Sequence, residues 1–334
     1  MPVFKRVAVG VPHRISGFFE IVDKGSARPK NHTIDDLLSI GSRGGGPCLS
    51  EKGITTVEID EKKTPGTITI LINGVDYSSN ARTTLSVLKW MDVDIAKEQS
   101  IIIRHDMPLL MGAGYGSSGS GALGTAIALN VMFDLGLSLD ECGKYAHAAE
   151  VENKTGLGTV GGQIRGGCTI SMVPGYPFTM ASIIVPPKIK IACVTRGGLS
   201  TAKMLSDPQI RKSIIESGKV AMSSISRRFT IENFLRTAIT FVNGTWMRFM
   251  EQLDLGAVKN LMSSINDDHA RRPVDVLGAS MNQMGKSVYV IYKSSVDAED
   301  YIEKVCMDCG FDDVRFMDIE CSGPSVHRVE SIQK

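Results

Sequence analysis

Glycine is the residue type that most constrains this chain, because it gathers in three clusters. The sequence holds 34 glycines in 334 residues, about one in ten against a usual share of about 7%. The clusters lie at residues 41–46, 112–124 and 156–167. Clustered glycine between periodic segments marks backbone that turns sharply or approaches a ligand. The three clusters are therefore the first candidates for sharp turns or for a binding site.

The second cluster, with the sequence PLLMGAGYGSSGSG at 108–121, is the most informative of the three. It follows an apolar strand expected at 101–104 and continues directly into a segment with helical periodicity. The first N–H groups of a helix have no internal partner and its dipole favours an anion, so glycines before it can wrap a phosphate. Ser117 and Ser118 add hydroxyl groups at the helix start. The cluster predicts a phosphate cradle without a lysine; the alternative is a helix start that only packs closely.

Other phosphate-binding patterns do not fit this cluster. No lysine follows the glycines, which excludes the P-loop. Residues 114–119 formally match G-x-G-x-x-G, but a dinucleotide-binding fold continues from helix to strand with an acid about 20 residues on. Here a second helix follows the first, and the protein-kinase strings H-R-D and D-F-G do not occur.

The remaining pattern indicates an α+β chain in two parts. The Pro-Pro pair at 186–187 is the expected boundary, which gives domains 1–186 and 187–334. The first part has expected strands at 3–11, 54–60, 68–72, 101–104, 167–173 and 179–186, and Asn73-Gly74 is a hairpin signal after the third of these. Its expected helices lie at 80–96, after residue 121 and at 139–152, and the last begins with a capping box formed by Ser138 and Glu141. The second part has expected strands at 189–195, 287–292 and 314–318, helices within 203–264 and at 296–309, and a short polar tail.

Charge and cysteine content narrow the function classes. Lys and Arg number 37 against 36 Asp and Glu, so there is no basic excess for nucleic acid or for an anionic membrane. No apolar stretch approaches the roughly 18 residues of a spanning helix, and the start lacks the apolar core of a signal peptide. The seven scattered cysteines fit reduced thiols, and the C-x-x-C at 306–309 is interpreted as helix packing. We expect a soluble cytoplasmic protein that acts on a small molecule.

The string GAGYGSS resembles the second motif of the GHMP kinases, which is usually written P-x-x-x-G-L-G-S-S. The strings PHRISGFFE (12–20) and GASMNQMG (278–285) occupy the places of the first and third motifs, the latter a glycine-rich loop. Within that superfamily ISGFFEI (15–21), GSRGGG (41–46) and GASMNQMG are similar to the archaeal pantoate kinases. The resemblance implies an N-terminal domain like ribosomal protein S5 domain 2 and a ferredoxin-like C-terminal domain. It also implies a homodimer.

The activity that the resemblance implies is ATP- and Mg²⁺-dependent phosphorylation of the primary hydroxyl of pantoate to 4-phosphopantoate, in archaeal coenzyme A biosynthesis. Ser118 and Glu150 would hold Mg²⁺, which prefers hard oxygen ligands. Glu152 competes with Glu150 for this role but lies roughly opposite on a helix. Arg14 stands where many GHMP kinases have Lys and would clamp phosphate oxygens. The ATP-binding residues implied are Gly112, Ala113, Gly114, Gly116, Ser117, Ser118 and Gly119.

At the catalytic base the sequence departs from the family pattern. By resemblance an Asp is expected seven residues before a Gly-Gly pair, and counting back from Gly166 gives Thr159. No Asp or Glu lies between Asn153 and Gly167. Thr159 could orient the acceptor hydroxyl in a loose transition state that needs no base. The alternatives are a GHMP kinase for another small alcohol, such as mevalonate or homoserine, and a non-catalytic nucleotide-binding paralogue.

The acyl substrate calls for a cation or a group of N–H donors for its carboxylate, and for an apolar wall. Ser42 with Arg43 is the first candidate pair, and Phe18 and Phe19 could supply the wall. His147, one turn before Glu150, could bind substrate, orient Glu150, or be a structural histidine. The further substrate candidates are Ser16, Gly17, Arg165, Lys203, Ser280 and Asn282.

Overall fold

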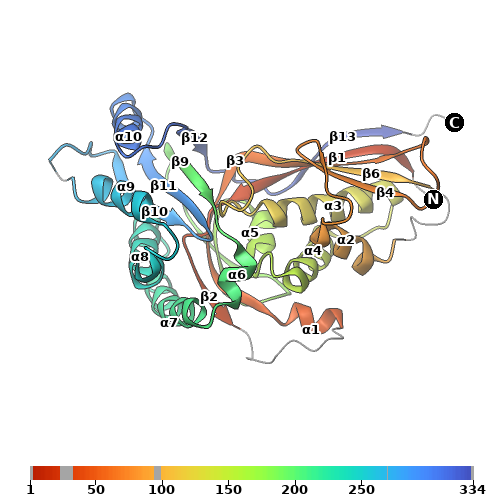
Figure 1. The fold of residues 1–334 in the computed structure, drawn as a ribbon, viewed down its shortest axis with the longest axis horizontal. Coiled ribbons are helices and arrows are strands. Elements are labelled where there is room, and N and C mark those ends of the chain that lie inside the picture. The colour runs from red at the N-terminus through yellow and green to blue at the C-terminus, as the bar shows by residue number, and fades with distance from the viewer. Residues whose placement is uncertain (1–2, 23–32, 94–98, 269, 332–334) are drawn as a thin grey trace.

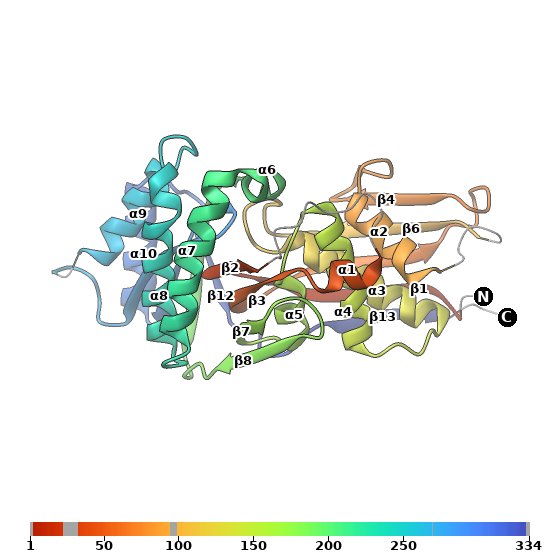
Figure 2. The ribbon, with the colours of Figure 1, turned by 90° about the horizontal axis from the view of Figure 1, so that it is seen from below.

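The computed structural model describes residues 3–22, 33–93, 99–268 and 270–331. The molecule is elongated, with a large sheet and its helices at one end and a smaller sheet with long helices at the other (Figure 1 and Figure 2). The α+β prediction is confirmed, since both parts combine sheets with covering helices. All seven cysteines are free thiols, as expected.

The larger sheet contains nine strands among the described residues, and its main path runs β13-β1-β3-β6-β4-β5. β2 and β7 pair with one end of β3, and β8 pairs with β7. The strands are β1 (Phe4–Arg14), β2 (Phe18–Val22), β3 (Gly41–Ile59), β4 (Ile68–Ile72), β5 (Val75–Asp76), β6 (Ile101–Asp106), β7 (Cys168–Val173), β8 (Thr179–Ile183) and β13 (Ser325–Ser331). β4 and β5 form the hairpin predicted from Asn73-Gly74.

The first glycine cluster lies inside β3, so the sharp turn that was one expectation for it is wrong. Gly44 has a φ of +123°, and a Cβ at this position would lie 2.4 Å from the carbonyl oxygen of Phe18. A Cβ at Gly45 would lie 2.1 Å from the carbonyl oxygen of Thr169. These glycines therefore let β2 and β7 approach β3 from its two sides.

Helices α2, α3 and α4 cover one face of the larger sheet (Figure 1). α3 follows the second glycine cluster as predicted, and α4 begins with the predicted Ser138–Glu141 capping box. The third glycine cluster contains a short helix, α5, for which the sequence pattern predicted no element. The helices of this part are α1 (Ile34–Leu38), α2 (Arg82–Met91), α3 (Ser117–Phe133), α4 (Leu139–Asn153) and α5 (Thr159–Arg165).

The smaller sheet is antiparallel, with the strand order β10-β11-β9-β12. With its helices this is a β-α-β-β-α-β arrangement, the ferredoxin-like topology that the resemblance implies. The elements are β9 (Ile189–Gly198), α6 (Thr201–Ser206), α7 (Pro208–Ile225), α8 (Ile231–Gly244), a 3₁₀ turn (Trp246–Phe249), α9 (Gly256–Asn266), β10 (Val276–Asn282), β11 (Gly285–Lys293), α10 (Val296–Asp308) and β12 (Arg315–Asp318).

Two expectations for the second part need correction. The string GASMNQMG is not a glycine-rich loop; it is the end of β10 and the tight turn into β11, with Met284 at a φ of 66°. The expected polar tail contains β13, which pairs with β1 in the larger sheet. The predicted division at 186/187 falls between β8 and β9, but the last strand returns to the first part.

The two parts are joined by a buried polar contact as well as by a shared apolar core. Trp246 is fully buried, and its indole N–H donates to the side-chain oxygen of Gln283. The Gln283 amide nitrogen donates to the carbonyl oxygen of Gly17 at 2.8 Å, and its backbone N–H donates to the Ser16 carbonyl at 3.1 Å. Trp246 therefore orients the side chain that ties the β10–β11 turn to the segment after β1.

The two tryptophans of the chain provide a matched test of this contact. We expect Trp246→Phe to lower the free energy of unfolding by about 1–3 kcal/mol, because the Gln283 oxygen is left buried without a donor. Trp90→Phe is the control: Trp90 is partly exposed, and its acceptor Glu152 keeps Lys89 as a partner. Urea denaturation followed by circular dichroism measures both. Equal destabilisation by the two substitutions would contradict this role of Trp246.

Candidate active site

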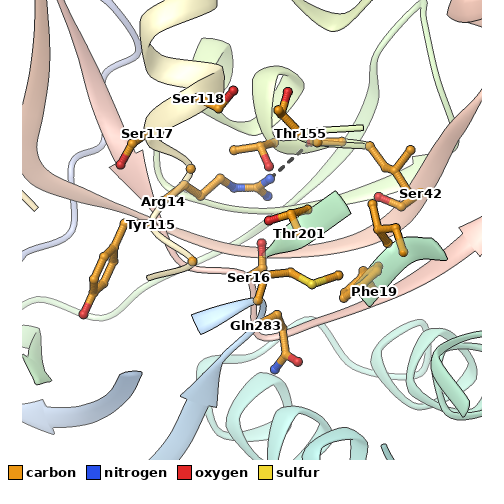
Figure 3. A pocket seen from close by; sticks show the side chains of 18 of the residues that line it. Arg14, Ser16, Phe19, Ser42, Tyr115, Ser117, Ser118, Thr155, Thr201 and Gln283 are labelled. Carbon is orange, nitrogen blue, oxygen red and sulfur yellow. Dashed lines mark hydrogen bonds between the residues drawn. The ribbon is translucent and has the colours of Figure 1, made fainter. Parts of the chain in front are cut away.

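A cavity of about 340 Å³ opens where the two parts of the chain meet. It lies between the glycine loop before α3, the segment between α4 and α5, the β2–β3 edge and α6. Figure 3 shows Arg14 near its centre, with Ser117 and Ser118 on one side, Ser42 on another and Ser16 below. The predicted site residues that line it are Arg14, Ser16, Ser42, Gly112, Gly114, Gly116, Ser117, Ser118 and Thr159.

The glycine loop has the backbone that an anion site requires. Gly112, Gly114 and Gly116 have φ values of 79°, 91° and 69°, in the left-handed region that favours glycine. Gly116 is the N-cap of α3, and no side chain caps the first N–H groups of this 17-residue helix. The Ser117 hydroxyl is buried and has no hydrogen-bond partner. An unpartnered buried hydroxyl beside uncapped N–H groups fits a bound phosphate group.

The second part of the chain holds this loop from behind. The Gly112 carbonyl accepts from the Leu199 N–H at 2.9 Å, and the Ala113 carbonyl accepts from the Ser287 hydroxyl at 2.7 Å. Tyr115, which ends the loop, shares a 2.8 Å hydrogen bond with Thr195. A Cβ at Gly285 would lie 1.9 Å from the Ala113 carbonyl oxygen. The β10–β11 turn thus packs directly on the loop.

Arg14 is buried at the cavity, and none of the residues that the structure describes gives it an acidic partner. Its side chain is 2% exposed, and the guanidinium donates to the Thr169 carbonyl at 2.6 Å and the Gly158 carbonyl at 3.5 Å. Burial lowers its pKa from the ordinary value. A Cβ at Gly162 would lie 2.0 Å from the Arg14 Cζ atom, and one at Gly45 would lie 2.5 Å from Nη2. The first and third glycine clusters therefore make room for this guanidinium.

Glu150 is the second buried charge of the site. Its carboxylate accepts from the Thr155 hydroxyl at 2.9 Å, and a Cβ at Gly156 would lie 2.0 Å from Oε2. Burial raises its pKa, and hydrogen bonds from Ser118 and Thr155 oppose that rise. Glu152, its competitor, lies outside the site and pairs with Lys89 at 2.9 Å.

The structure therefore brings Ser118 and Glu150 together, as predicted for a Mg²⁺ site. One hydroxyl and one carboxylate are hard oxygen ligands that fit Mg²⁺ when phosphates and waters complete its shell. The described residues contain no group of three or more His, Cys, Asp or Glu side chains placed to hold a metal. The metal role of the pair stays a prediction.

Thr159 begins α5 and lines the cavity. Its methyl group packs on the glycine loop, since a Cβ at Gly116 would lie 2.6 Å from Thr159 Cγ2. Among the described residues, no Asp, Glu or His lines the cavity. Glu150, which is buried beside Ser118, is not part of this wall. The described residues that do line the cavity thus include no ordinary general base.

Several predicted substrate residues lie away from the cavity. Arg43 forms an ion pair with Glu20, and Arg165 pairs with Asp140 at 3.1 Å on the surface. Lys203 is exposed on α6 and does not line the cavity. Four others are also absent from its wall: Gly17, His147, Ser280 and Asn282.

The buried members of this set have structural contacts. His147 is 1% exposed, donates from Nε2 to the Ile40 carbonyl at 3.0 Å, and has its pKa lowered to about 4 by burial. The Asn282 side-chain oxygen accepts from the Ser16 N–H at 3.1 Å, which ties β10 to the segment after β1. Ser280 is fully buried in the same strand.

Sequence reasoning missed six polar residues of the wall: Tyr115, Lys154, Thr155, Ser200, Thr201 and Gln283. Lys154 and Thr155 follow α4 directly, so their distance of four and five residues from Glu150 was a usable signal. Ser200 and Thr201 come from the start of α6, and only the docking of the second part places them here. Figure 3 shows Thr201 on the opposite side of Arg14 from Ser118.

A second cavity of about 340 Å³ adjoins the first beside α2. The two share Met111, Ser117, Ser118 and Thr155 in their walls. The second is further lined by Tyr77, Asn80, Arg82 and Met107. One extended ligand could therefore pass from the second cavity over the start of α3 into the first.

Among the described residues, no helix is long and apolar enough to cross a membrane.

Comparison with solved structures supports the fold. A phosphotransferase related to the CoA biosynthesis pathway superposes with a TM-score of 0.77 at 22% identity, covering 97% of this chain and 99% of that chain. A homoserine kinase from Cytophaga hutchinsonii superposes with a TM-score of 0.63 at 14% identity, covering 97% and 98%. The arrangement of sheets and helices is thus that of GHMP kinase structures.

Sequence comparison gives the family. The family model described as "GHMP kinases N terminal domain" matches residues 82–167, which run from the start of α2 to the third glycine cluster. A pantoate kinase from Thermococcus kodakarensis is 30% identical over 70% of this chain and 74% of its own length. One from Methanocaldococcus jannaschii is 28% identical over 84% and 91%. With the fold, the glycine loop and these relatives in agreement, the chain belongs to the GHMP kinases and, among them, to the pantoate kinase family.

Proposed function

We propose that this protein is an ATP- and Mg²⁺-dependent kinase that phosphorylates the primary hydroxyl of pantoate to 4-phosphopantoate. The proposal rests on one observation above all: two adjoining cavities meet at an uncapped helix start beside a buried, unpaired arginine. A triphosphate bound there places its last phosphate beside Arg14 and the acceptor. The names of the sequence relatives support pantoate as the acceptor. A homodimer and a cytoplasmic location remain predictions.

The residues of this chain supply binding and orientation. The N–H groups at the start of α3 and the Ser117 hydroxyl bind phosphate oxygens, and Arg14 holds oxygens of the transferred phosphoryl group. Mg²⁺, when bound, neutralises charge on the β- and γ-phosphates, and Ser118 and Glu150 would hold it. The low exposure of Arg14 and Glu150 keeps competing water away from both.

Thr159 orients the acceptor hydroxyl in this proposal. Because no described carboxylate or imidazole lines the cavity, the hydroxyl proton passes late to a phosphate oxygen or to solvent. Phosphoryl transfer through a loose transition state tolerates this, since little proton transfer is needed before the bond to phosphorus forms. The absence of a described base also supports a second candidate, a nucleotide-binding protein without turnover.

The first experiment measures ADP release with Mg·ATP and, in separate reactions, D-pantoate, mevalonate, homoserine and shikimate. We expect turnover with pantoate alone, at a kcat in the ordinary range for kinases of about 1–100 s⁻¹. Turnover with a different alcohol would overturn the acceptor and keep the site. ATP binding without ADP release from any of the four would favour the non-catalytic candidate.

Glu150→Gln tests the buried carboxylate through stability as well as activity. Its raised folded-state pKa means that ionised Glu150 costs stability above that pKa, a cost absent below its unfolded value of about 4.3. We therefore expect the ligand-free variant to melt at or above the wild-type temperature at pH 8, with a weaker loss of stability as pH rises from 5 to 8. We also expect kcat to fall about 100-fold and stabilisation by Mg·ATP to disappear.

Glu152→Gln is the matched control for this experiment, two positions further along α4. It breaks a surface ion pair with Lys89 and should keep both turnover and stabilisation by Mg·ATP. A Glu150→Gln variant that melts well below wild type at pH 8, and is still stabilised by Mg·ATP, would show that the carboxylate is structural.

Thr159→Asp tests whether the site is adapted to threonine. An aspartate here places a negative charge against the start of α3, where the phosphates bind, with repulsion of several kcal/mol at about 4 Å in a partly buried site. We expect kcat/KM for ATP to fall at least about tenfold, while Thr159→Ser, which keeps the hydroxyl, retains most activity. Higher turnover in the Asp variant would mean that a base at this position improves catalysis and that the proposed role of Thr159 is wrong.

A further inference from the structure

Lys154 is a cation at the cavity that neither the sequence patterns nor the family comparison assigns. It follows α4 directly, is exposed, and its residue lines the first cavity. Its φ of 57° is left-handed, and its backbone N–H donates to the Val151 carbonyl at 3.2 Å. The backbone at this point is thus fixed relative to Glu150, while the ammonium forms no ion pair or hydrogen bond with any described residue.

The other basic residues expected to hold the acceptor carboxylate are occupied or elsewhere. The Arg43 guanidinium is neutralised by Glu20, whose side chain is only 6% exposed. Arg165 is paired with Asp140 on the surface, and Lys203 is outside the cavity wall. His147 is buried and, with its pKa lowered to about 4, uncharged at neutral pH. Among the described residues, Arg14 and Lys154 are the two basic residues that line this cavity.

These two cations stand at different parts of the wall. Arg14 lies beside the phosphate loop, because a Cβ at Gly116 would lie 3.9 Å from the Cβ atom of Arg14. Lys154 belongs with the segment that leads to Leu157, whose carbonyl accepts from the Ser42 N–H at 2.9 Å. Ser42, Phe18 and Phe19 also line this cavity. The wall that this segment continues is therefore polar at Ser42 and apolar at the two phenylalanines.

We propose that Lys154 binds the carboxylate of the acceptor, so that the site selects compact alcohols carrying an anionic group. This rests on the proposed kinase function and deepens it. Arg14 is left for the phosphoryl group, and the apolar side chains of the same wall receive the branched carbon body.

The test uses Lys154→Asn, because asparagine tolerates the left-handed backbone and removes only the charge and the long stem. Binding of D-pantoate is measured by calorimetry in the presence of a non-hydrolysable ATP analogue, and KM values are measured alongside. We expect pantoate binding to weaken about tenfold, as for a lost hydrogen bond to a charged group, with ATP affinity unchanged. Lys154→Arg should restore most of the affinity, and the primary amide of pantoate should bind both proteins equally.

Lys144→Gln is the control. Lys144 is a lysine of α4, its ammonium lies 5.7 Å from the centre of the Tyr145 ring, and it lines neither cavity. Unchanged pantoate binding in Lys154→Asn, or equal weakening of pantoate and ATP, would overturn the inference. Wild-type protein that binds pantoate without turning it over would refute the proposed kinase function, and the Lys154 variants would still be judged by binding. Wild-type protein that binds no pantoate would overturn both.

Discussion

The burial of an unpaired guanidinium is the constraint on which the rest of the site depends. A charge taken out of water must be compensated by hydrogen bonds or by an opposite charge. Arg14 is 2% exposed, and its hydrogen bonds to the described residues all go to carbonyl and hydroxyl oxygens, those of Thr169, Gly46 and Gly158. Those oxygens reach it because Gly45 and Gly162 carry no side chain. Three separate segments are thereby drawn around one residue at the end of β1.

Glu150 presents the same situation with the opposite sign. The Glu150 carboxylate is buried, and its described hydrogen-bond donors are the hydroxyl groups of Ser118 and Thr155. Its pKa is raised because burial makes the ionised form less stable. The two buried charges do not neutralise one another, since Arg14 bonds to carbonyls near α5 and Glu150 to Thr155 after α4. In the proposed function each charge meets a charged ligand: a phosphoryl group for the cation and a divalent metal for the carboxylate. Stability given up in the free protein is recovered on binding.

Local pattern was sufficient for much of the architecture. The alternation of apolar residues predicted β1, β4 and β6, Asn73-Gly74 predicted the hairpin, and the capping box predicted the start of α4, because each of these depends on neighbours in sequence. The glycine loop and α3 were predicted for the same reason. The first half of β3 and all of β10 were missed because their glycines resemble turns. The structure shows what excludes side chains there: neighbouring strands at Gly44 and Gly45 in β3, and side chains of α8 and α9 at Gly278 in β10.

The candidate site also combines features that local sequence determines with features that only packing decides. The sequence by itself determined the helix start with its glycines and hydroxyls, the presence of Arg14 and Glu150, and the absence of an Asp at 159, since each follows from residue type and spacing. Only the tertiary structure decided which cations remain available: Arg43 and Arg165 meet acids that are distant in sequence, whereas Lys154 meets none that the structure describes. Charge pairing depends on distances between segments, and those distances are set by packing, which no local pattern contains.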